Sequence, residues 1–173
     1  MDTLREALDF ISDFVPSPSV SGQMSYPLLS AGLEWEDIEQ QVSVLPFKLA
    51  EEVYDLYQWS NGAYLGSLPY PKKSDWSTYY QPIFNILPLE RAIAIAQDWG
   101  NGSFPLTEDE SAYVCFTVGA SEQQRTSPIF CSDESCDTRN QTPCFESLTS
   151  MMIRLVEAVN YQINLLRENT NEQ

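Results

Sequence analysis

The sequence contains no histidine and few basic residues. Among 173 residues, nine Lys and Arg stand against 25 Asp and Glu, so the formal net charge is -16. Without an imidazole, Ser-His-Asp and Cys-His mechanisms are excluded and the commonest zinc ligand is missing. A surface of this sign also argues against nucleic acid and anionic membranes, because both attract cations. A basic protein is the complementary partner, although acidity could equally serve solubility alone.

The sequence also lacks a C-x-x-C pair and any long apolar run. No zinc ribbon or thioredoxin-like motif is therefore indicated by its four cysteines, Cys115, Cys131, Cys136 and Cys144. No segment approaches the roughly 18 apolar residues that a membrane span needs. The first five residues lack the basic-then-apolar layout of a signal peptide. We therefore expect a cytoplasmic protein with reduced thiols.

The cysteines divide into two pairs by their surroundings. Cys115 and Cys131 lie in apolar, strand-like runs and are predicted to be small core residues. Cys136 and Cys144 lie in a polar segment and could pair or bind a metal. Carboxylates, Lys, Tyr and bare Cys are the groups left for catalysis, and no paired carboxylates or phosphate-binding glycine motif stand out. We expect no catalytic residues, no cofactor and no metal.

Local signals predict three helices in the first third of the chain. A capping box, Thr3 with Glu6, opens the first. The second is short, with its apolar side at Trp35, Ile38 and Val42. Pro46 suits the first turn of the third helix, which Asn61-Gly62 closes. The side of this third helix that faces water is predicted to carry Glu51, Glu52, Asp55 and Gln58.

Strand-like patterns dominate the second half of the chain. They cover residues 83–87, 103–106, 112–118 and 127–131. A helix from Pro88 to Gly100 separates the first two, and a last helix begins at Ser147 and frays after Arg167. The predicted fold is α+β: a small antiparallel sheet of about four to six strands, packed by N-terminal helices and a long C-terminal helix.

Three segments, in this order, resemble the SUKH superfamily (SMI/KNR-type domains). They are residues 45–62, LPFKLAEEVYDLYQWSNG; residues 86–93, ILPLERAI; and residues 127–130, SPIF, followed by 145–152, FESLTSMM. The family includes yeast cell-wall-synthesis regulators and bacterial toxin-immunity proteins. Its signature residues here are Leu45, Pro46, Trp59, Asn61 and Gly62. Where many relatives carry a Gly-Gly-Asp-type turn, this chain has residues 108–111, EDES.

A length of 173 residues fits one domain, and we expect a single SUKH-like domain over residues 1–173, of which the resemblance covers roughly 33–159. Residues 1–32 form an N-terminal helix and loop, 33–160 the family-like core, and 161–173 the helix end and a polar tail. A non-catalytic protein-binding role is implied, and its sharpest form is an immunity protein that masks a basic toxin. The alternatives are an intracellular scaffold that docks several partners and, less favoured, an enzyme or small-molecule-binding protein.

Two groups of residues are candidate partner contacts. The first is an aromatic set in a Pro/Gly-rich segment: Tyr64, Tyr70, Trp76, Tyr79 and Tyr80. The second is an acidic set: Glu108, Asp109 and Glu110. The rings could instead fold back to cap the sheet, and the acidic set could be a solvated turn or hold Mg²⁺ or Ca²⁺. Trp59 could be a core anchor or present an exposed indole edge.

Overall fold

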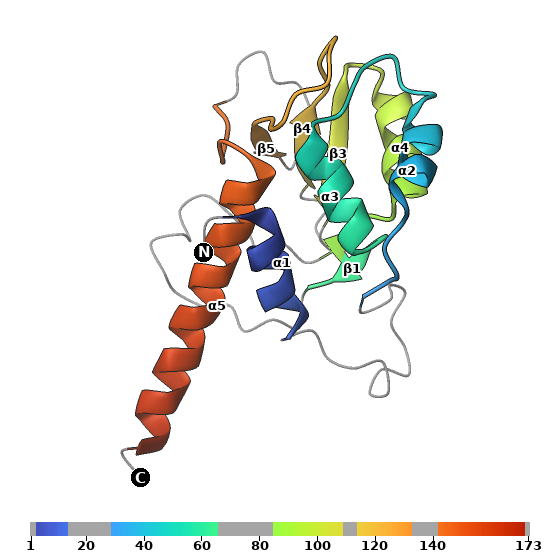
Figure 1. Cartoon of the computed structure of the whole chain (residues 1–173). Coiled ribbons are helices and arrows are strands. Elements are labelled where there is room, and N and C mark those ends of the chain that lie inside the picture. The colour runs from blue at the N-terminus through green and yellow to red at the C-terminus, as the bar shows by residue number, and fades with distance from the viewer. Residues whose placement is uncertain (1–2, 14–28, 66–84, 109–113, 133–141, 172–173) are drawn as a thin grey trace.

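The computed structural model describes residues 3–13, 29–65, 85–108, 114–132 and 142–171. Five strands form one antiparallel sheet (Figure 1). Along the chain, helices precede the first strand, separate the second strand from the third, and follow the last. In chain order the elements are α1 (Leu4–Ser12), α2 (Trp35–Val42), α3 (Glu51–Trp59), β1 (Ala63–Tyr64), β2 (Asn85–Ile86), α4 (Leu89–Trp99), β3 (Ser103–Glu108), β4 (Val114–Val118), β5 (Ile129–Ser132) and α5 (Leu148–Asn171). The predicted α+β fold with a small sheet is confirmed.

The sheet is a meander in which the spatial order of the strands follows their sequence order, β1 to β5. The long central pair, β3 and β4, is irregular between Pro105 and Thr107, where the register shifts. Isolated bridges extend both edges, Leu29 against Ala63 and Phe145 against Ile129. The edge strands therefore have part of their backbone paired by neighbouring segments.

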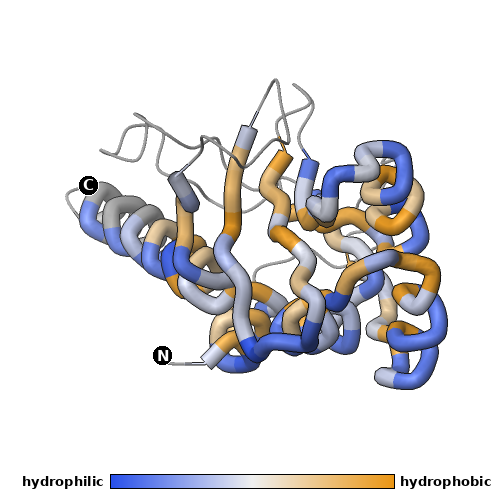
Figure 2. The backbone as a smooth tube through the Cα atoms, turned by 90° about the horizontal axis from the view of Figure 1, so that it is seen from above, coloured by the Kyte–Doolittle hydropathy of each residue, from blue (hydrophilic) through white to orange (hydrophobic). Residues whose placement is uncertain are grey.

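The core lies between the sheet and the helices. In Figure 2 the central strands are largely apolar, and hydrophilic stretches follow the outer turns of the helices around them. Helix α1 lies beside α5 (Figure 1) and buries Leu8 and Ile11. Tyr57 of α3 is fully buried and meets the Phe104 ring edge-on, with centroids 6.5 Å apart. Its burial, with the nearby charge of Glu90, raises its pKa above the ordinary value.

Strand β4 is covered on both faces at its centre. Alternation predicts one inward face, yet Cys115, Phe116 and Thr117 are all buried. Phe116 points away from the other two and meets the ring edge of Trp99 while it stacks on Phe130. A small aromatic cluster thus supplements the main core.

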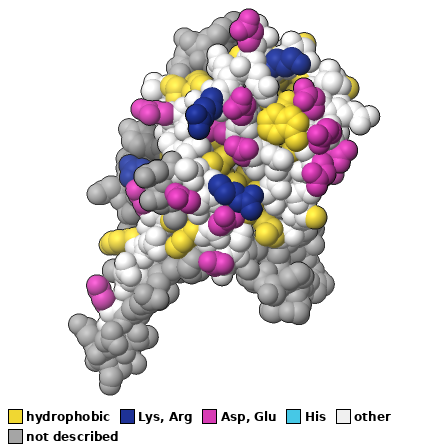
Figure 3. Space-filling view, viewed as in Figure 1, with side chains coloured by type: hydrophobic (Ala, Val, Ile, Leu, Met, Phe, Trp, Pro, Cys, Tyr) yellow, Lys and Arg dark blue, Asp and Glu magenta, His cyan; other side chains and the backbone are white. Residues whose placement is uncertain are grey.

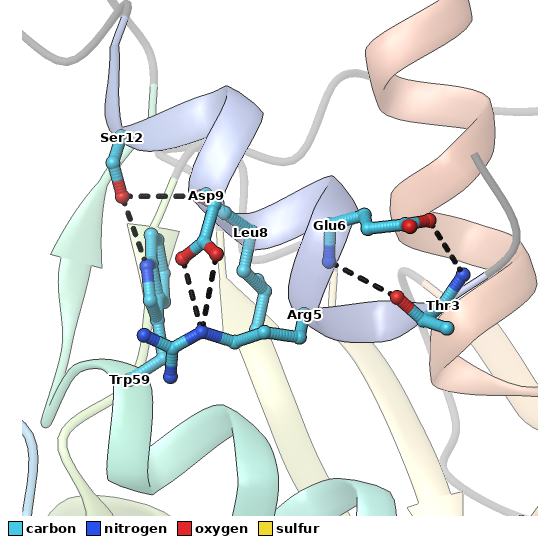
Figure 4. Close-up of polar contacts among 7 residues, drawn as sticks. All are labelled: Thr3, Arg5, Glu6, Leu8, Asp9, Ser12 and Trp59. Carbon is cyan, nitrogen blue, oxygen red and sulfur yellow. Dashed lines mark hydrogen bonds and ion pairs between the residues drawn. The ribbon is translucent and has the colours of Figure 1, made fainter.

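Several predicted caps are present. The Thr3–Glu6 capping box opens α1 (Figure 4), and Gly100 ends α4 with a φ of 62°. At the start of α5, Ser147 Oγ accepts a hydrogen bond from the Ser150 backbone N–H at 3.0 Å. These signals are local in sequence, so they could be recognised without tertiary contacts.

Other predicted boundaries were wrong. The third helix begins at Glu51 rather than Pro46, because Lys48 pairs with Ala120 through two backbone hydrogen bonds. Ala63 and Tyr64, predicted to be irregular, form β1. Helix α5 continues past Arg167 to Asn171.

The largest departure from the prediction concerns Glu52, which is buried rather than facing water. Its side chain is 3% exposed and accepts four hydrogen bonds. One carboxylate oxygen binds the backbone N–H groups of Ser127 (3.1 Å) and Leu148 (2.9 Å). The other binds the backbone N–H and the hydroxyl of Thr149, each at 3.1 Å. Glu52 thus caps α5 from α3, where the helix dipole favours a negative charge.

We expect Glu52→Gln to lower the free energy of unfolding by about 3 kcal/mol or more, because an amide N–H₂ would then face backbone donors inside the protein. Glu51→Gln, one position away and exposed, is the matched control and should change stability by less than about 0.5 kcal/mol. Urea denaturation of both variants measures the difference. Equal midpoints would show that the Glu52 contacts do not hold α5 in place.

Candidate functional site

Three residues of the quoted motif, Trp59, Asn61 and Gly62, lie at the end of α3 and have structural roles. Asn61 Oδ1 accepts a hydrogen bond from the Leu89 backbone N–H at 2.7 Å, and Asn61 Nδ2 donates to Glu90 at 3.3 Å. Asn61 therefore caps the first turn of α4, where the residue before the helix, Pro88, has no side-chain acceptor. The first two resembling segments are joined by this contact.

The turn from α3 into β1 requires a glycine at position 62. Its backbone φ is +99°, a value that residues with a Cβ atom rarely adopt. An added Cβ would also lie 3.1 Å from the Pro88 ring. The Asn61-Gly62 pair thus brings the chain from α3 into β1 and against the start of α4, rather than simply ending a helix.

Trp59 anchors α3 to α1. Its indole Nε1 donates a 3.0 Å hydrogen bond to Ser12 Oγ, and the Ser12 hydroxyl donates to the Leu8 carbonyl (Figure 4). The ring is half-buried and packs against the core. Of the remaining signature residues, Leu45 is buried and Pro46 is exposed.

The predicted partner contacts are not gathered into one place among the described residues. Tyr64 is half-buried on β1, opposite Asn85. Glu108 is ion-paired with Arg91 at 2.9 Å, so its charge is engaged within the chain. The other predicted contacts lie outside the described residues: Tyr70, Trp76, Tyr79, Tyr80, Asp109 and Glu110.

A different surface, formed by α2 and α3, combines aromatic and acidic side chains. Half-buried Trp35 stacks on Tyr54, with ring centroids 4.4 Å apart, and donates from Nε1 to Glu39 at 3.2 Å. Figure 3 shows acidic side chains on both sides of a hydrophobic patch over these helices. We call it the α2–α3 surface; its exposed carboxylates belong to Glu34, Glu36, Asp37, Glu39, Glu51 and Asp55.

Charges on this surface repel one another. The pKa of Asp55 is raised by partial burial and then by the charge of Glu51, although Arg125 and Arg5 oppose the shift. The pKa of Tyr54 is raised by burial and by Glu39. Burial is the larger cause of both shifts, and the carboxylates of Glu51 and Glu39 add to it.

An apolar loop borders the same surface. Val44, which follows the last turn of α2, is 58% exposed, and Pro46 beside it is also exposed. Trp35 was predicted only as part of the apolar side of its helix. The sequence feature that could have indicated this surface is its charge pattern, since residues 34–42 contain four carboxylates and no basic side chain.

Among the described residues, no group of three His, Cys, Asp or Glu side chains is placed to hold a metal ion. No helix in that part of the chain is long and apolar enough to cross a membrane. Compared with models of known protein families and with curated proteins, the chain matches none. The SUKH resemblance therefore stays a prediction carried by the three segments.

We expect Asn61→Ala to lower the free energy of unfolding by about 1 to 2 kcal/mol, as the loss of a helix cap does. Asn160→Ala, on an exposed position of α5, is the matched control and should change stability by less than about 0.5 kcal/mol. Thermal unfolding compares the two. If both variants melt like the unmodified protein, Asn61 has no capping role.

Proposed function

We propose that this protein is a non-catalytic binding module that docks a basic protein on the α2–α3 surface. The observation that carries the proposal is half-buried Trp35, which stacks on the buried ring of Tyr54 and is flanked by exposed carboxylates. Aromatic anchors surrounded by polar groups are typical of binding hot spots. Carboxylates around them select partners with Lys and Arg at complementary positions.

Charge supports the proposal at two ranges. At long range, a net charge of -16 attracts a cationic protein and speeds its association. At contact, each exposed ion pair contributes only about 0.2 to 1 kcal/mol, so several are needed for a stable complex. Six carboxylates on one surface provide for several pairs, and Trp35 adds apolar contact area.

The SUKH resemblance narrows the proposal to an immunity protein that covers a basic toxin in the cytoplasm. The alternative to an immunity protein, a regulatory scaffold, would use the same surface for several basic partners. The two are separated by what the protein captures from its native host: one tightly bound toxin or several weaker partners. A toxin gene beside this one would favour immunity.

The test begins with the partner recovered from the native host and identified by mass spectrometry. Neutralising the carboxylate before α2 and two in its first turn, in Glu34→Gln/Glu36→Gln/Asp37→Asn, should weaken its binding about 3- to 150-fold, because three exposed ion pairs are lost. A control with the same net charge, Asp98→Asn/Glu122→Gln/Glu146→Gln, changes exposed carboxylates elsewhere and should bind nearly normally.

Salt provides the second arm of this experiment. Affinity of the unmodified protein should fall as ionic strength rises, and the α2 variant should respond less. Equal losses in the two triple variants would show that only total charge matters. Binding that does not change with salt would exclude the electrostatic proposal.

Removal of the aromatic anchor is an independent test. We expect Trp35→Ala to weaken partner binding at least about tenfold, as hot-spot truncation does. Trp99→Ala removes a half-buried indole that contacts Phe116 and serves as the control. Calorimetric titration gives the affinities, and circular dichroism verifies that each variant is folded. If both substitutions leave affinity unchanged, Trp35 lies outside the interface.

A further inference from the structure

Three cysteine side chains meet at the β4–β5 edge of the sheet. Cys115 and Cys131 are direct cross-strand partners, and their sulfur atoms lie 2.7 Å apart. The Cys131 thiol also hydrogen-bonds Cys144. Cys144 reaches this place because its backbone N–H, like that of Phe145, binds the Ile129 carbonyl at the outer edge of β5. All three cysteines are free thiols.

The backbone pairing favours a bond between the two strand cysteines. The N–H and C=O groups of Ile129 both bind the segment at residues 144–145, so they point away from β4. Ile129 and its β4 partner Thr117 are therefore a non-hydrogen-bonded pair. Because the directions alternate from residue to residue, the pair two positions further, Cys131 with Cys115, is non-hydrogen-bonded as well. The Cα atoms of such pairs lie about 4.5 Å apart, within the range that disulfides span.

Burial separates Cys115 from the other two thiols, which are both half-buried. Cys115 is 5% exposed, so it is shielded from a bulky oxidant. Cys144 is half-buried and lies between exposed residues, Pro143 and Glu146. Hydrogen bonds to Cys115 and then Cys144, followed by burial, raise the pKa of Cys131. Cys144 lies at the outer edge of β5, and the raised pKa of Cys131 makes that thiol the slower nucleophile, so we take Cys144 as the first thiol to react.

We propose that this cluster is a thiol-oxidation site in which Cys144 receives an oxidising equivalent from a small-molecule disulfide and passes it inward to a Cys115–Cys131 disulfide. The site is distinct from the α2–α3 surface and does not depend on the proposed binding function. The sequence had suggested instead that Cys136 and Cys144 could pair, and Cys136 lies outside the described residues.

Three exchange steps balance the reaction with glutathione disulfide as oxidant. The Cys144 thiolate attacks one glutathione sulfur, and the other half leaves and takes up a proton. Cys131 then attacks the Cys144 sulfur and releases the second glutathione, which takes the Cys131 proton. Finally Cys115 attacks the Cys131 sulfur, and Cys144 leaves and takes the Cys115 proton. Two protein thiols lose two electrons, and glutathione disulfide becomes two glutathione molecules.

The experiment uses the reduced full chain, glutathione disulfide and peptide mapping after alkylation of the remaining thiols. Trypsin separates the three thiols because it cleaves after Arg125, Arg139 and Arg154. Fragmentation then distinguishes Cys131 from Cys136 on their shared peptide. We expect a Cys115–Cys131 disulfide in the unmodified protein and, at an unchanged rate, in Cys136→Ser.

Each cysteine variant should stop the exchange reaction at a different intermediate. Cys131→Ser should hold glutathione on Cys144, and Cys115→Ser should accumulate a Cys131–Cys144 disulfide. Cys144→Ser should form the Cys115–Cys131 bond at least about tenfold more slowly. Alanine versions provide second variants where a serine version fails to fold. A Cys136–Cys144 product, no disulfide, or an unchanged rate in folded Cys144→Ser would overturn the proposal.

Discussion

The buried carboxylate of Glu52 is the interaction on which the assembly of this fold depends. An ionised side chain inside a protein costs several kcal/mol unless donors saturate its oxygens. Here the donors come from Ser127, just before β5, and from the first turn of α5 at Leu148 and Thr149. These segments lie 75 to 97 positions further along the chain. Helix α3 and the C-terminal part of the domain therefore stabilise each other, since neither satisfies these polar groups alone.

Helix α3 is fixed at its other end by the signature residues. Trp59 binds Ser12 of α1, and Asn61 caps α4. The two residues that give the chain much of its family resemblance thus join helices from different parts of the sequence. Together with Glu52, these contacts join the three segments quoted in the sequence analysis to one another.

The sequence predicted what neighbouring residues determine. The Thr3–Glu6 box, the Gly100 stop and the Ser147 cap were recognisable because each acts within one helical turn. The burial of Glu52 was not recognisable, since helical spacing placed it with the exposed carboxylates and its donors are remote. The α2–α3 surface was not predicted, because the sequence placed the candidate contacts among residues 64–80 and 108–110. Its position around Trp35 depends on the stack with α3, which the pattern of α2 alone does not show.

The contrast between Glu51 and Glu52 shows how one helix can serve both folding and binding. Adjacent carboxylates on α3 point to different environments, one to solvent and one to the start of α5. Changing the inner group breaks contacts with two segments, the residue before β5 and the start of α5, whereas changing the outer group alters only surface charge at small cost. Under the proposed function, substitutions of exposed carboxylates on the α2–α3 surface would therefore alter partner binding while the fold is kept.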